Sequence, residues 1–89
     1  MERVLAELRG LRASTGLRQR AIAERMELSE LQLSRILNGY TTPPTGFEAR
    51  FRAAVAELAA EEAQRERAEA EARARAIEAA AGIPTSLAA

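Results

Sequence analysis

Arginine and glutamate carry all the side-chain charges of this 89-residue sequence, with 13 of each, and the chain has no Cys, His, Asp or Lys. Without Cys and His it forms no disulfide, no thiolate or imidazole metal site, and no Ser-His or Cys-His nucleophile pair. Nothing in the sequence places two glutamates in an apolar pocket, where they could act as general acid and base. We therefore expect no enzyme, no metal and no cofactor.

The polar chemistry that remains is hydrogen bonding by guanidinium, amide and carboxylate groups. Residues 1–52 hold nine Arg and six Glu, a net charge of +3, whereas residues 53–89 hold four Arg and seven Glu, a net charge of −3. The excess of positive charge favours a polyanion as partner of the first part.

The composition predicts an all-α fold. Only Tyr40, Phe47 and Phe51 are aromatic, so the core must be built from Leu, Ile, Val, Met and Ala, which suit helices better than sheets. No apolar run approaches the roughly 20 residues that span a bilayer, and the charged N-terminus does not resemble a signal peptide. We expect a cytoplasmic protein. A domain this small has thin stability margins, which an oligomer contact would widen.

Three short helices are predicted in the first 39 residues. The first runs from Glu2 to Ser14 and ends at Gly16, which supplies a left-handed stop. The second covers about 18–26, and the third spans 30–37 behind Ser29 as N-cap. Asn38-Gly39 then forms a turn. The side chains expected to face the core are Val4, Leu5, Leu8, Leu11, Ile22, Ala23, Met26, Leu33, Ile36 and Leu37.

A much longer helix follows an extended loop over residues 40–44, where two prolines exclude helix. Thr45 and Glu48 are spaced as a capping box, and the sequence stays compatible with helix from Gly46 to Ala81. Gly82-Ile83-Pro84 then predicts its end. A helix of about 36 residues is roughly 54 Å long, so part of it must project from so small a core.

The first turns of this helix carry a core stripe of Phe47, Phe51, Val55 and Leu58, but Ala, Glu, Arg and Gln alone fill the sequence from residue 59 to 76. Pairs such as Glu61/Arg65 are spaced to support an isolated helix. Two interpretations remain open. The helix is solvated along its length, or it self-associates along a face of small residues that recur with a period near seven and are broken only at Arg67. That face consists of Ala56, Ala60, Ala63, Ala70, Ala74, Ile77 and Ala81.

Residues 17–39 resemble, without a gap, the helix-turn-helix of the Cro/C1-type (Xre) phage and bacterial repressors. Gln19 opens the second helix, small Ala23 lies where the two helices touch, and Asn38-Gly39 closes the segment. The resemblance covers about residues 4–58. It implies a compact, lambda-repressor-like DNA-binding domain of about four helices, whose last helix continues here as a long Ala/Glu/Arg-rich helix.

The resemblance also implies that the helix over 30–37 enters the major groove. Because Leu33, Ile36 and Leu37 face the core, the outward residues available for base reading are Glu30, Leu31, Gln32 and Arg35. Arg35 can pair with guanine, Gln32 with adenine, Leu31 with a thymine methyl and Glu30 with a cytosine amino group. Gln19 and Asn38 match phosphate-contacting positions of the family. Their expected neighbours on the DNA backbone are Arg12, Arg18, Tyr40 and Thr41.

The sequence departs from the family at two places. Glu27 stands where the family usually has Gly in the turn, so a non-glycine residue would have to adopt a positive φ, at a cost of about 1 kcal/mol. The last helix also continues past Leu58, where family members commonly break. The family therefore gives no information on residues 59–89.

We accordingly divide the chain into a DNA-binding domain over 1–58, a helical extension over 59–82 that can oligomerise, and a flexible tail over 83–89. The predicted function is a sequence-specific transcriptional regulator, a repressor that binds an inverted-repeat operator in double-stranded DNA as a homodimer. The alternative is a protein-interaction or antitoxin-like module, in which the helix-turn-helix is scaffold and the long helix or Leu31 binds a protein partner.

Overall fold

The structure is a computed structural model that describes the backbone of residues 1–88 and the side chains of residues 1–82. Four helices make up the described chain: α1 (Glu2–Thr15), α2 (Gln19–Arg25), α3 (Glu30–Leu37) and α4 (Phe47–Ala88). The all-α prediction is confirmed. No helix among the described residues is both long and apolar enough to cross a membrane.

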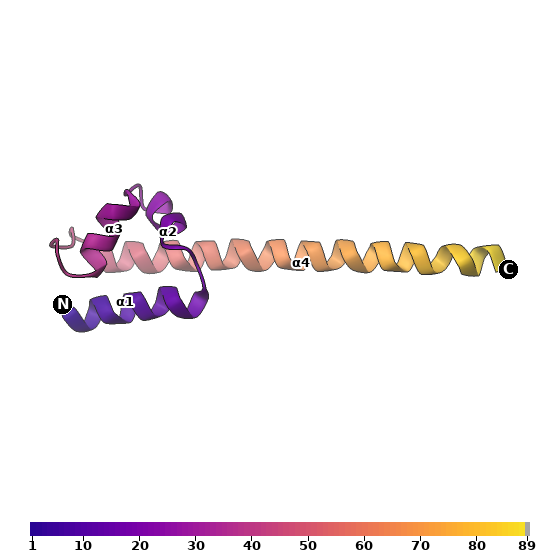
Figure 1. Ribbon diagram of the computed structural model, residues 1–89, viewed down its shortest axis with the longest axis horizontal. Coiled ribbons are helices and arrows are strands. Elements are labelled where there is room, and N and C mark those ends of the chain that lie inside the picture. The colour runs from indigo at the N-terminus through magenta and orange to yellow at the C-terminus, as the bar shows by residue number, and fades with distance from the viewer. Residues whose placement is uncertain (89) are drawn as a thin grey trace.

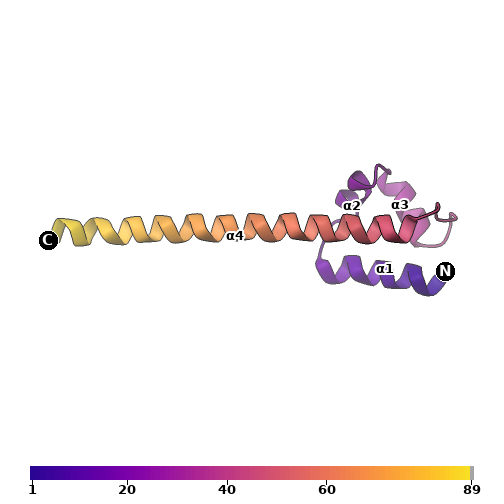
Figure 2. The ribbon, with the colours of Figure 1, turned by 180° about the vertical axis from the view of Figure 1, so that it is seen from behind.

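The three short helices lie around the first turns of α4. Figure 1 shows α1 to α3 grouped around this end, with the rest of α4 projecting alone, and Figure 2 shows the same from behind. Both α3 and α4 pack against α1 and α2. The radius of gyration is 20.4 Å, against about 12 Å expected for a compact domain of this length. The projecting helix accounts for the excess.

The core confirms the predicted apolar stripes. Phe51, Leu8, Ile22, Leu33 and Leu37 are the largest fully buried side chains, and they come from all four helices. Two further buried residues were not predicted: Leu17, in the link before α2, and Ala54 on α4. Val4, Leu11, Leu28 and Leu58 are only partly buried against this core.

The turn between α2 and α3 has the strained conformation that the sequence predicted. Glu27 has a φ of 60°, the only positive φ of a non-glycine residue among those described. The backbone N–H of Glu27 donates to the carbonyl of Glu24 at 3.1 Å, and the N–H of Leu28 donates to that of Ala23 at 2.9 Å. These bonds hold the turn, so a side chain occupies a conformation that ordinarily favours glycine.

Both ends of α4 differ from the prediction. The helix begins at Phe47, directly after Gly46 with its φ of 77°, so Thr45 is one residue too early to be the N-cap. At the other end the helix continues to Ala88 rather than stopping at Ala81. Gly82 keeps a negative or extended φ, and one glycine in a helix costs only about 1 kcal/mol. The predicted flexible tail is therefore helical through Ala88, while Ala89 lies outside the described residues.

Replacing Glu27 by glycine is expected to stabilise the protein by about 1 kcal/mol, because glycine adopts positive φ without steric cost. Chemical denaturation followed by circular dichroism measures this difference. Glu27→Ala is the matched control, since alanine has the same steric conflict as glutamate, and its stability should stay within about 0.5 kcal/mol of the parent. A less stable Glu27→Gly variant would contradict the assignment of strain to this turn.

Candidate nucleic-acid interface

The outer side of α3 is presented to solvent because its inner side is fixed in the core. Leu33, Ile36 and Leu37 are buried. The four residues predicted to read bases, Glu30, Leu31, Gln32 and Arg35, are all exposed, with Leu31 retaining 58% of its accessible surface. Neither the Glu30 carboxylate nor the Arg35 guanidinium has a hydrogen-bonding partner within the part of the chain that the structure describes. Both are available to an external ligand.

Two hollows flank this outer side and bring together residues from separate elements. In one, Gln19 of α2 lies beside Glu30, Leu31 and Ser34 of α3. In the other, Gln32 and Arg35 lie beside Thr41 and Thr42 of the following loop. The structure therefore joins two of the predicted phosphate-binding residues, Gln19 and Thr41, to the predicted base-reading residues. Ser34 and Thr42 border the same surface and were not predicted.

The remaining predicted phosphate-binding residues are spread around this surface. Arg18 is exposed in extended backbone directly before α2. Tyr40 is 84% exposed after the end of α3. Arg12 is half-buried, and its guanidinium donates to the carbonyl of Leu17 at 3.3 Å. The Asn38 amide donates to the carbonyl of Ser34 at 2.8 Å, within the last turn of α3. Arg12 and Asn38 thus have structural bonds that a phosphate contact would have to share or replace.

Gln32 holds the start of α3 through a capping box with Ser29. The Gln32 side-chain oxygen accepts from the backbone N–H of Ser29 at 2.8 Å, and the Ser29 hydroxyl accepts from the N–H of Gln32 at 3.0 Å. The sequence had indicated Ser29 as cap but had assigned Gln32 to adenine. Bidentate pairing with adenine would use the same amide oxygen, so the cap leaves chiefly the amide N–H₂ for DNA.

Several arginines bind the scaffold, which the sequence analysis did not predict. Arg9 donates to the carbonyl of Leu37 at the end of α3. Arg50 donates at 3.1 Å to the carbonyl of Met26, the capping residue directly after α2. Positive charge at a helix C-terminus is favourable because the helix dipole is negative there. Arg52 pairs with Glu7 of α1 at 3.4 Å and with Glu48 at 3.6 Å. These bonds join α1 to α3, and they join α4 to α1 and to the end of α2.

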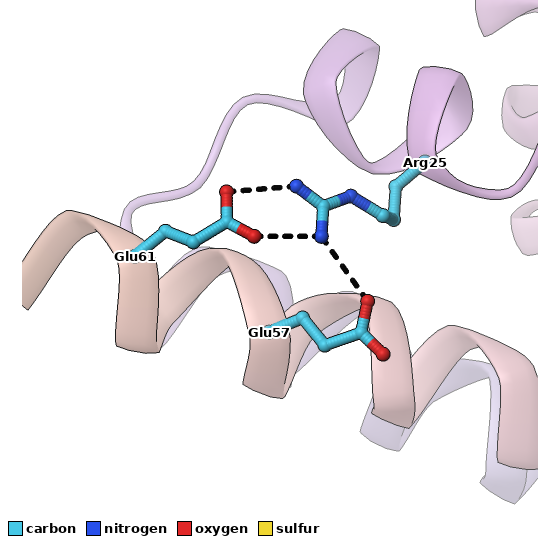
Figure 3. Close-up of polar contacts among 3 residues, drawn as sticks. All are labelled: Arg25, Glu57 and Glu61. Carbon is cyan, nitrogen blue, oxygen red and sulfur yellow. Dashed lines mark hydrogen bonds and ion pairs between the residues drawn. The ribbon is translucent and has the colours of Figure 1, made fainter.

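The most developed of these contacts is the clasp, which we define as Arg25, Glu57 and Glu61 (Figure 3). The two terminal nitrogens of Arg25, at the end of α2, donate to the two carboxylate oxygens of Glu61 at 2.7 and 2.8 Å. One of those nitrogens also donates to Glu57 at 3.1 Å. The sequence spacing had indicated that Glu61 pairs with Arg65 on the same helix. In the structure, Glu61 instead binds across to α2. Because Arg25 and Glu61 are 36 positions apart, no local sequence pattern predicts their contact.

The clasp shifts the pKa values of Arg25 and Glu61. Hydrogen bonding from Arg25, with a further contribution from its charge, lowers the pKa of Glu61, and burial opposes this only in part. Hydrogen bonds to both carboxylates raise the pKa of Arg25, which stays charged. The clasp is located where α4 leaves the domain, since beyond Glu62 every described residue is exposed.

Comparison with known proteins identifies the arrangement. A family model described as a helix-turn-helix domain matches residues 3–68. The match spans α1, α2, α3 and the first half of α4, and it reaches ten residues beyond the predicted boundary at Leu58. No curated protein and no solved structure matches the chain.

Replacing Gln32 by alanine is expected to cost about 1 kcal/mol of stability without any DNA present, because α3 loses half of its capping box. Gln32→Glu is the control, since glutamate at this position completes a capping box equally well and should leave stability unchanged. Thermal unfolding of the three proteins measures the difference. Equal stability of Gln32→Ala and the parent would show that Gln32 does not hold the helix.

Replacing Glu61 by glutamine is expected to lower stability at neutral pH, and the difference from the parent should shrink on acidification. The folded-state pKa of Glu61 is lowered, so its contribution is present above the ordinary glutamate pKa and is lost as the pH falls through the folded value. Unfolding midpoints between neutral pH and pH about 3 test this. The exposed Glu69, on the projecting part of α4, provides the control Glu69→Gln, which should show no such dependence.

Proposed function

Because the chain belongs to this helix-turn-helix domain family, we propose that it is a sequence-specific DNA-binding transcriptional regulator, a repressor of the Cro/C1 type from a phage or bacterium. It acts in the cytoplasm on an inverted-repeat operator, as a homodimer. One observation carries the proposal: the outer side of α3 is exposed, with Glu30 and Arg35 free of partners among the described residues, while its inner side is buried. The long C-terminal extension leaves this side uncovered, because α4 packs on α1 and α2 and then projects away from the domain (Figure 1).

The proposed roles follow from which side-chain groups are free. Arg35 donates a bidentate pair to guanine, and Leu31 contacts a thymine methyl. Glu30 accepts from a cytosine amino group, which offsets its repulsion from nearby phosphates. Gln19 and Thr41 bind phosphates on either side of α3, and Arg18 adds positive charge before α2. Gln32 contributes its amide N–H₂ while its oxygen caps the helix.

A homodimer is part of the proposal for an energetic reason. A single module of this size buries too little surface and neutralises too few phosphates for tight specific binding, so two-fold symmetry is expected. The projecting part of α4 supplies the contact. Its residues 63–82 are all exposed and have no role in the core.

The exposed Leu31 and the acidic extension also fit the alternative of a protein-interaction or antitoxin-like module. Binding to random and selected duplexes, measured at 50–200 mM salt, separates the two. Phosphate contacts make affinity fall steeply with salt, with a slope that counts the neutralised phosphates. No binding to any duplex at the lowest salt would exclude the regulator and favour the interaction module.

Replacing Arg35 by alanine is expected to weaken binding to the selected sequence by about 1–3 kcal/mol and to relax the preference at one base pair. Selection from random duplexes with the parent and variant proteins measures both effects. Arg65→Ala removes the same charge from the projecting helix and should leave the base preference unchanged. An unaltered preference in Arg35→Ala would remove this residue from the readout.

A further inference from the structure

The face of α4 that points away from the core is one continuous strip of small residues, longer than the sequence alone had indicated. Within the domain the strip begins at Ala49 and Ala53, which are both exposed. The same alternation of four- and three-residue steps continues from these two residues into the face of small residues predicted on the extension. Among its ten positions only Arg67 is charged. We call this strip the alanine seam; it consists of Ala49, Ala53, Ala56, Ala60, Ala63, Arg67, Ala70, Ala74, Ile77 and Ala81.

An apolar groove lies at the N-terminal end of the alanine seam. It has a volume of about 490 Å³ and is formed by the first residues of α1, the Pro43-Pro44 loop and the start of α4. Ala49 belongs to both the seam and the groove lining. The carboxylate in the groove, that of Glu48, is already paired with Arg52. Any chain that follows the seam past Ala49 therefore enters a mostly apolar surface, in which the N-terminal ammonium of Met1 is the one group whose charge is not paired within the described chain.

We propose that a second copy of this chain binds antiparallel along the alanine seam, so that its last helical turns cover the groove of the first copy. Centred near residue 65, this register places Ala49 of one copy opposite Ala81 of the other and Ala53 opposite Ile77. The backbone of α4 continues for seven residues beyond Ala81. These seven residues then lie over the groove. The proposal rests on the homodimer of the proposed function and specifies how it is built.

A dimer in this register buries more surface than a contact along the alanine seam alone, and the larger area favours the register. From Ala49 to Ala81 the seam is about 48 Å long, and helices of about 10 Å diameter bury on the order of 500 Å² each along it. The total of about 1,000 Å² only reaches the lower limit of a specific interface. Covering both grooves adds apolar area at each end, which the parallel arrangement does not do.

The position of Arg67 also favours the antiparallel pair. In a parallel dimer, Arg67 would face its own copy across the seam and place two like charges together. In the antiparallel register it faces Ala63, whose small side chain leaves room for the guanidinium to reach solvent. The dipoles of the two long helices also oppose each other in this arrangement.

Because the chain has no cysteine, single-cysteine variants of the full-length protein report the orientation directly. In the antiparallel register residue 56 faces residue 74, so an equimolar mixture of Ala56→Cys and Ala74→Cys should form a disulfide-linked dimer under mild oxidation. Ala56→Cys alone should not. Ala72→Cys, on the opposite side of α4, is the matched control and should stay unlinked alone and in mixtures.

Efficient cross-linking of Ala56→Cys alone would overturn the proposal in favour of a parallel pair, and a monomeric mass by light scattering would overturn the seam dimer altogether. Removing residues 83–89 should weaken dimerisation at least about tenfold, because the groove loses its cover; an unchanged dimer constant would contradict the groove contact.

Duplex binding by the same variants is measured separately. A monomer that still binds DNA refutes only the dimer, whereas a dimer that binds no duplex refutes only the regulator.

Discussion

The orientation of α3 depends on one shared hydrophobic core over the first turns of α4. Helices of seven and eight residues, as α2 and α3 are, are not stable alone in water. They form because Ile22 and Leu33 are buried in one core cluster with Phe51 and Leu8. The same burial decides which side of α3 remains outside. The exposed reading surface is therefore a consequence of packing, and every function proposed for this surface depends on that core staying closed.

Polar contacts divide the arginines of the domain into two groups. Arg9, Arg25, Arg50 and Arg52 donate to helix ends or pair with carboxylates on other elements, and Arg12 and Arg20 have partners close in sequence. Arg3, Arg18 and Arg35, by contrast, have no such partner within the described chain, and of these Arg35 lies on α3 itself. The net charge of +3 on residues 1–52 thus overstates the charge that is free for phosphates, because much of it is committed to the scaffold. A module with so few free cations gains affinity by acting in pairs, in line with the proposed homodimer.

Local patterns predicted the fold well because helix periodicity, caps and turn residues are properties of neighbouring positions. Gly16, Ser29 and the strained Glu27 all have the roles that the sequence indicated. The clasp and the Arg50 bond to Met26 were missed because they join elements 24 to 36 positions apart. Gln32 was interpreted from its outward position alone, although its spacing from Ser29 already fitted a capping box. The end of α4 was misplaced because Gly82 and Pro84 weaken a helix without forbidding it.

The clasp holds α4 to the domain at the point where the helix begins to project. A long Ala-rich helix has little tertiary support beyond Leu58, so its first free turns would be prone to fray or bend where the core ends. Arg25 reaches across from α2 to Glu57 and to Glu61, one turn further on, and thereby holds α4 to the domain for that additional turn. The helix then leaves the domain in a direction set by its packing against α1 and α2, the two elements that also contact α3. Any partner bound along α4 is in this way held in a set relation to the reading surface, through the shared core and the clasp at the end of α2.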